Sequence, residues 1–107
     1  MGLLITAQIS WIRAEFGGRT HPPVIGLRPT IRFQRDVGKW LSLAWDVEIA
    51  ELDIDLQTMC GTAALAFSGG ASPDMQNIKE GELIELLDAY RVIGVGKIIH
   101  ISNSYAS

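Results

Sequence analysis

Apolar and polar side chains alternate along several short runs of this chain, and this period of two constrains the fold more than any other feature. In the first run the apolar residues are Ile5, Ala7, Ile9 and Trp11. Because successive side chains of a β-strand point to opposite faces, this pattern predicts a strand with one buried face. The same reasoning predicts strands around residues 30–34 and 62–68, so the runs favour an all-β fold.

The alternation changes phase in the middle of the chain. From residue 41 to residue 49 the apolar side chains hold the odd positions, whereas Leu52 and Ile54 hold even positions. A regular strand cannot bury both sets on one face, because each side of the strand takes every second residue. We therefore expect a bulge, a bend or a strand end at Ala50–Glu51.

The segment from residue 17 to residue 29 can form neither a helix nor a central strand. It reads Gly-Gly-Arg-Thr-His-Pro-Pro-Val-Ile-Gly-Leu-Arg-Pro. Its glycines permit positive φ, and its prolines fix φ and remove amide donors. We expect a stiff, exposed connection that carries two arginines and a histidine. A turn is also predicted at residues 36–39, and a flexible loop at residues 69–74.

The same segment carries a resemblance to a known family. Gly-Gly-Arg followed by Thr20, His21 and proline, and then Gly-x-Arg-Pro ahead of a strand, resembles the third, C-terminal domain of elongation factor Tu. The family usually has His-Thr where this chain has Thr-His. The last run, Arg91–Ile99, is similar to the family's terminal strand with its two glycines.

The resemblance extends over residues 3–101 and is weakest between residues 50 and 80. It implies an all-β fold, a closed six-stranded antiparallel barrel. A chain of 107 residues with 48% hydrophobic composition can bury one modest core, so length also predicts a single domain over residues 1–107. Closure of the barrel would remove free strand edges.

The segment from residue 78 to residue 90 has two interpretations. Its apolar residues at helical spacing, Leu83, Leu86, Leu87 and Tyr90, favour a helix. The resemblance instead implies a strand over residues 82–86, after Gly81, and a hairpin turn at residues 88–90. We expect the strand.

Two glycines of the last run, Gly94 and Gly96, fall on one face of the predicted strand. Glycine weakens a strand unless a crossing strand or a ligand backbone approaches closely, and packing inside a barrel is the commoner reason. The resemblance implies that this strand and the loop approach the backbone of the T-stem of aminoacyl-tRNA. The expected RNA- or partner-binding residues are Arg19, Thr20, His21, Arg28, Gly94 and Gly96.

Charge is distributed unevenly along the chain. The formal net charge is −3, but residues 1–45 carry +4 and residues 46–107 carry −7. The two parts could form a basic and an acidic face of one barrel, or they could neutralise each other across it. Binding to a phosphate backbone usually requires an excess of Lys and Arg, which the whole chain lacks.

Enzymatic activity is not expected. The phosphate-binding pattern of a GTPase is absent, so no GTP is expected, and the lone Cys60 has no histidine nearby in the sequence to act as its base. The histidines make no metal-binding pattern, so no metal or other cofactor is expected. The carboxylates at Asp53, Asp55 and Glu51 fit a solvated strand face better than an acid–base pair.

The sequence therefore predicts a non-catalytic binding module. It could bind a tRNA stem backbone or a translation component; the alternative is a protein-interaction module, for example one that neutralises a toxin. The alternative draws support from Trp40 if that residue is exposed. No apolar run is long enough to cross a membrane, and a single cysteine suits a reducing compartment, so a cytoplasmic location is expected.

Overall fold

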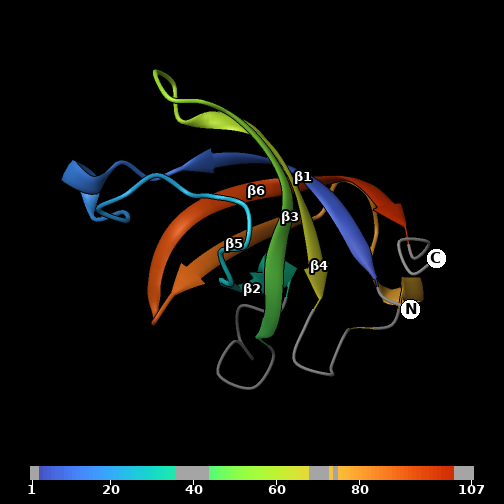
Figure 1. Cartoon of the computed structure of the whole chain (residues 1–107). Coiled ribbons are helices and arrows are strands. Elements are labelled where there is room, and N and C mark those ends of the chain that lie inside the picture. The colour runs from blue at the N-terminus through green and yellow to red at the C-terminus, as the bar shows by residue number, and fades with distance from the viewer. Residues whose placement is uncertain (1–2, 36–43, 68–72, 74, 103–107) are drawn as a thin grey trace.

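The computed structural model shows an all-β protein that forms a closed six-stranded antiparallel barrel, as the sequence predicted (Figure 1). It describes residues 3–35, 44–67, 73 and 75–102. The elements are β1 (Leu4–Trp11), η1 (Ala14–Phe16), β2 (Thr30–Phe33), β3 (Trp45–Asp55), β4 (Cys60–Phe67), η3 (Met75–Asn77), β5 (Leu83–Asp88) and β6 (Arg91–Ser102). Around the barrel the strand order is β1-β4-β3-β2-β5-β6, and β6 pairs with β1 to close it.

The core follows the alternation of the sequence. Every second residue of β1 from Ile5 to Trp11 is buried, and Ile31 and Phe33 of β2 are buried in the same way. Strand β4 is buried on both faces in its second half, because Ala64 and Ala66 are small enough to be covered. Side chains from all six strands thus fill a single barrel interior.

A β-bulge lies where the phase of the pattern changes. In the ladder between β3 and β4, Ile49 pairs with Leu65 and Glu51 pairs with Ala64, so Ala50 is an extra residue on β3. The bulge lets Ile49 before it and Leu52 after it both turn toward the core. The predicted irregularity at Ala50–Glu51 is confirmed.

The strand interpretation of residues 78–90 is confirmed, and the helical alternative is wrong. Strand β5 ends at Asp88, and the hairpin turn to β6 has Ala89 at φ 49° and Tyr90 at φ 74°. Helical spacing was misleading because Leu83 is half exposed and Tyr90 is almost fully exposed, so the four apolar residues share no buried face. The core side of β5 is instead formed by Ile84 and Leu86.

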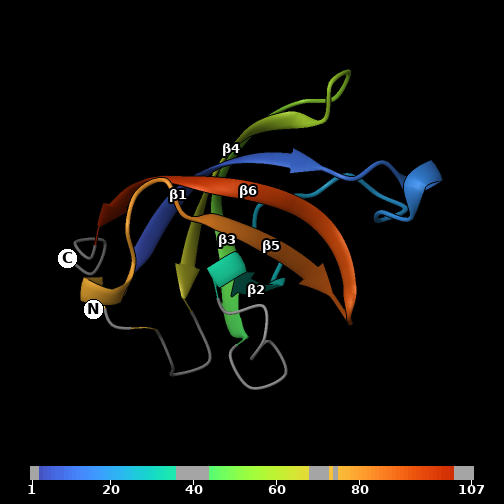
Figure 2. The same cartoon turned by 180° about the vertical axis from the view of Figure 1, so that it is seen from behind.

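The β3–β4 hairpin, the β5–β6 hairpin and the loop that contains η1 extend from the barrel (Figure 1). The tip of the β3–β4 hairpin stands clear at the top, and the loop with η1 reaches out on the left. From behind, β6 and β5 curve across the front toward their shared turn (Figure 2). The predicted turn at residues 36–39, Trp40, and the predicted loop at residues 69–74 apart from Pro73 lie outside the described residues. Within the described part, no helix has the length and apolarity that crossing a membrane requires.

Candidate binding surface

The loop between β1 and β2 begins with a tight structure that needs both of its adjacent glycines. Gly17 ends the 3₁₀ turn η1 with φ 95°, in the left-handed region where a side chain is disfavoured. Gly18 lies so close to the preceding backbone that an added Cβ would sit 1.9 Å from the carbonyl oxygen of Ile12. The Gly-Gly-Arg motif therefore folds the chain back on itself just before Arg19, whose side chain is largely covered, at 23% exposure.

Arg19 fastens this loop to the turn between β5 and β6. Its Nε lies 3.7 Å from a carboxylate oxygen of Asp88, and its Nη1 donates to the carbonyl of Pro22 at 3.3 Å. From the other side, Arg91 Nη1 donates to the carbonyl of Gly18 at 3.3 Å. The loop of residues 12–29 and the turn of residues 88–91 are therefore held together, and we call these two segments the loop end.

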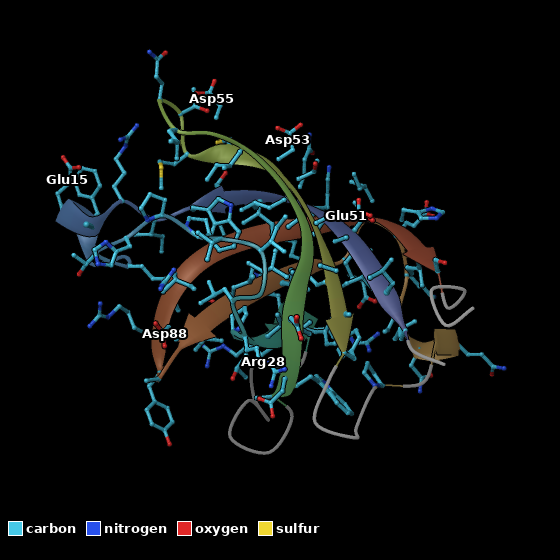
Figure 3. All side chains as sticks on the ribbon, viewed as in Figure 1. Glu15, Arg28, Glu51, Asp53, Asp55 and Asp88 are labelled. Carbon is cyan, nitrogen blue, oxygen red and sulfur yellow. The ribbon has the colours of Figure 1, made fainter. Side chains whose placement is uncertain are left out.

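The predicted site residues of the loop fall in two places. Arg19, Thr20 and His21 border one shallow cavity of about 130 Å³ beside η1, and Thr20 and His21 are exposed. Arg28 lies apart from them, near the lower part of β3 (Figure 3). There its guanidinium is 3.4 Å from Glu48, with 73% of the side chain exposed.

The two glycines of β6 are explained by packing within the barrel. A Cβ on Gly94 would meet the Trp11 ring at 3.1 Å, and one on Gly96 would lie 2.8 Å from the backbone oxygen of Gln8. The side chain of Ile9 fills the space between these positions, within 3.2 Å of both added atoms. Strand β1 therefore occupies the volume that side chains at these two positions would need.

Arginines of the first half of the chain meet carboxylates of the second half. In addition to the pairs of Arg19 and Arg28, Arg32 lies 2.6 Å from Glu85 and Arg35 lies 2.9 Å from Glu82. Of the two arrangements considered for the uneven charge, these pairs correspond to mutual neutralisation across the barrel. These ion pairs reduce the positive charge that the arginines offer to an anionic ligand.

Sequence reasoning missed the exposed apolar side chains of the loop end. Phe16 is 74% exposed and Tyr90 is 91% exposed, and Val24 and Ile25 are also exposed. A signal was present, because Phe16 and the Val24–Ile25 pair are apolar residues in a segment that the strand pattern cannot bury.

The carboxylates Glu51, Asp53 and Asp55 are exposed and follow one another along the upper edge of the β3–β4 hairpin (Figure 3). Nearby, Cys60 contacts Ser10 Oγ and the carbonyl oxygen of Thr58, each at 3.5 Å. Among the described residues, no group of three or more His, Cys, Asp or Glu is arranged to hold a metal ion.

A comparison with models of known protein families found no match, and a comparison with curated protein sequences found none either. The resemblance to the third domain of elongation factor Tu therefore stays a prediction.

Proposed function

We propose that this protein is a non-catalytic binding module that docks a partner protein through its loop end. The observation that carries the proposal is the exposure of Phe16, Val24, Ile25 and Tyr90 on two segments that Arg19 and Arg91 fasten together. Burying a side chain of this size at an interface contributes roughly 1.5–3 kcal/mol. Aromatic residues and arginine are the types that most often dominate the binding energy of protein interfaces.

A protein partner fits the charges of this surface better than a nucleic acid does. Arg19 and Arg28 each lie beside a carboxylate, and the chain as a whole is acidic. A phosphate backbone would have to compete with Asp88 and Glu48 for these guanidinium groups. The family resemblance leaves a translation component among the candidate partners, with tRNA as the competing ligand.

A binding role without catalysis is supported by the surroundings of the reactive groups. Catalytic carboxylates work in water-poor, asymmetric settings, whereas Asp53 and Asp55 stand on an exposed strand edge. The contacts of Cys60 described above are a hydroxyl and a carbonyl, neither of which would act as the base for a thiol nucleophile.

Affinity purification from the native host, followed by binding measurements with the purified partner, tests the proposal. Replacing Phe16 and Tyr90 by serine is expected to weaken binding at least tenfold, because each loses a buried aromatic contact. Ile99→Ser is the matched control, since Ile99 is also exposed but lies on β6 away from the loop end.

The same purification distinguishes the nucleic-acid alternative. The protein-docking proposal would be overturned if tRNA is captured and its binding falls steeply with salt. That binding would be lost in the Arg19→Ala, Arg28→Ala double variant and kept in the variants of Phe16 and Tyr90. Equal loss of partner binding in Ile99→Ser would also overturn the proposal, because it would show that the loop end has no special role.

A further inference from the structure

A second hollow, larger than the cavity beside η1, lies on a different part of the barrel. It is an open groove of about 880 Å³, with a floor formed by β1, β6 and β5 and one wall formed by the projecting end of the β3–β4 hairpin. Leu83 and Val95 contribute exposed apolar area to the floor, and Lys97 lies between Gln8 of β1 and Leu83 of β5. The groove is thus bordered by an element of the same chain that itself stands out from the barrel (Figure 1).

The strand registers place opposite charges on the two sides of this face. One row of paired residues runs from Asp53 on β3 through Thr62 and Gln8 to Lys97 on β6. Asp53 and Lys97 are three strand spacings apart, about 14 Å, which is too far for an ion pair within one chain. Neither residue takes part in the salt bridges found among the described residues.

A two-fold axis would bring these charges together between two copies. An axis parallel to the strands, running between β4 and β1, places β3 of one copy over β6 of the other and keeps each row aligned. Asp53 of each copy then faces Lys97 of the other. An axis perpendicular to the strands would instead set Asp53 against Asp53, so charge selects the first arrangement.

The shape of the face agrees with the same arrangement. The hairpin stands on one side of the axis and the groove lies on the other, so the hairpin of each copy enters the groove of its partner. The inserted hairpin would cover Leu83 and Val95, and Asp55 near its end, in the row that ends at Val95, would approach Lys97 from the adjacent row. Glu85, the carboxylate beside Val95 in this groove, is paired with Arg32 at 2.6 Å.

We infer that this face binds a second copy of the chain, forming a two-fold symmetric dimer in which each β3–β4 hairpin occupies the groove of the other. One groove and one hairpin from each copy form the whole contact, which makes it a small interface of the kind that associates weakly. The dimer is therefore weak, and it forms and dissociates with protein concentration. None of the residues that line the groove belongs to the loop end, so the proposed function and the dimer rest on different residues and can fail separately.

Sedimentation of the full chain over a wide concentration range tests the dimer. The wild type is expected to change from monomer to dimer as concentration rises, with weaker association at high salt. Lys97→Glu alone, or Asp53→Lys together with Asp55→Lys, is expected to weaken the dimer about tenfold or more, because each homodimer then opposes like charges.

Mixing the two charge-reversed proteins gives the decisive result. Each of the two contacts in the mixed dimer again joins opposite charges, so the mixture is expected to recover most of the association that each protein alone has lost. The control reversals Lys79→Glu and Glu80→Lys lie on exposed residues outside the groove and should leave the dimer unchanged.

A wild type that stays monomeric at all concentrations would overturn the proposal. Dimerisation of unchanged strength in the variants reversed at residues 53, 55 and 97 would overturn it as well. So would a failure of the two charge-reversed proteins to associate when they are mixed. All the exchanged side chains are at the surface, and a thermal melt of each variant confirms that the barrel remains folded.

Discussion

The Nε of Arg32 on β2 donates to a carboxylate oxygen of Glu85 on β5 at 2.6 Å, across the seam where the shortest strand joins the barrel. Both side chains are largely covered, at 16% and 30% exposure. Water therefore screens this pair less than the exposed pair of Arg28 and Glu48.

Arg32→Ala is expected to destabilise the protein by about 1–3 kcal/mol, because Glu85 would lose its charged partner while remaining partly buried. Urea unfolding measures the change. The comparison variant, Arg28→Ala, is expected to cost no more than about 1 kcal/mol. Equal costs for the two variants would contradict the role given to the covered pair.

The glycines of β6 should differ in their tolerance of alanine. Gly96→Ala places a Cβ against the backbone oxygen of Gln8, which cannot move without disturbing the strand pairing, and we expect a loss of about 2–4 kcal/mol. Gly94→Ala meets the side chains of Trp11 and Ile9, which can shift, so a smaller loss is expected. Thermal unfolding of both variants tests this order, and the reverse order would contradict it.

Deleting Ala50 should damage the fold far more than substituting it. Without the bulge, Leu52 and Ile54 would exchange faces with Glu51 and Asp53, so charges would enter the core or apolar side chains would leave it. We expect the deletion to give an unfolded or insoluble chain, whereas Ala50→Ser should change stability by about 0.5 kcal/mol or less. Circular dichroism and solubility distinguish the two, and a well-folded deletion variant would rule out this account of the bulge.

Tyr90→Gly should make the protein more stable. Tyr90 is almost fully exposed and adopts φ 74°, which is strained for a bulky side chain and free of strain for glycine. A gain of about 0.5–1 kcal/mol is expected in chemical unfolding. If the loop end binds a partner, the same variant should bind that partner less well. A loss of stability would contradict the view that Tyr90 is strained in this turn.

Much of the barrel follows from local pattern. The period of two located β1 and β2, and the change of phase located the bulge at Ala50, because both depend only on which face of a strand is buried. Periodicity failed for residues 83–90, where exposed Leu83 and Tyr90 imitate a helix; there the strand was expected from the resemblance alone.

The candidate surface was harder to foresee. The motif indicated that Arg19 and Arg28 would be exposed, which holds for Arg28 at 73% but not for Arg19 at 23%. Their carboxylate partners come from other strands and depend on the barrel's strand order. The same holds for the row that joins Asp53 to Lys97. Strand register decides which residues from distant parts of the chain face one another. The identity of a single residue does not reveal that register.

The ladder that closes the barrel pairs Leu4 with Ser102. Strand β1 precedes β6 in the chain, so β1 cannot complete its hydrogen bonds until β6 has been synthesised, and Leu4 and Ser102 must come together before the core can seal. Folds dominated by such distant pairings acquire their structure slowly, in milliseconds to seconds. Until β6 pairs with it, one edge of β1 is open to other chains, so synthesis itself is a stage at which this protein is exposed to aggregation.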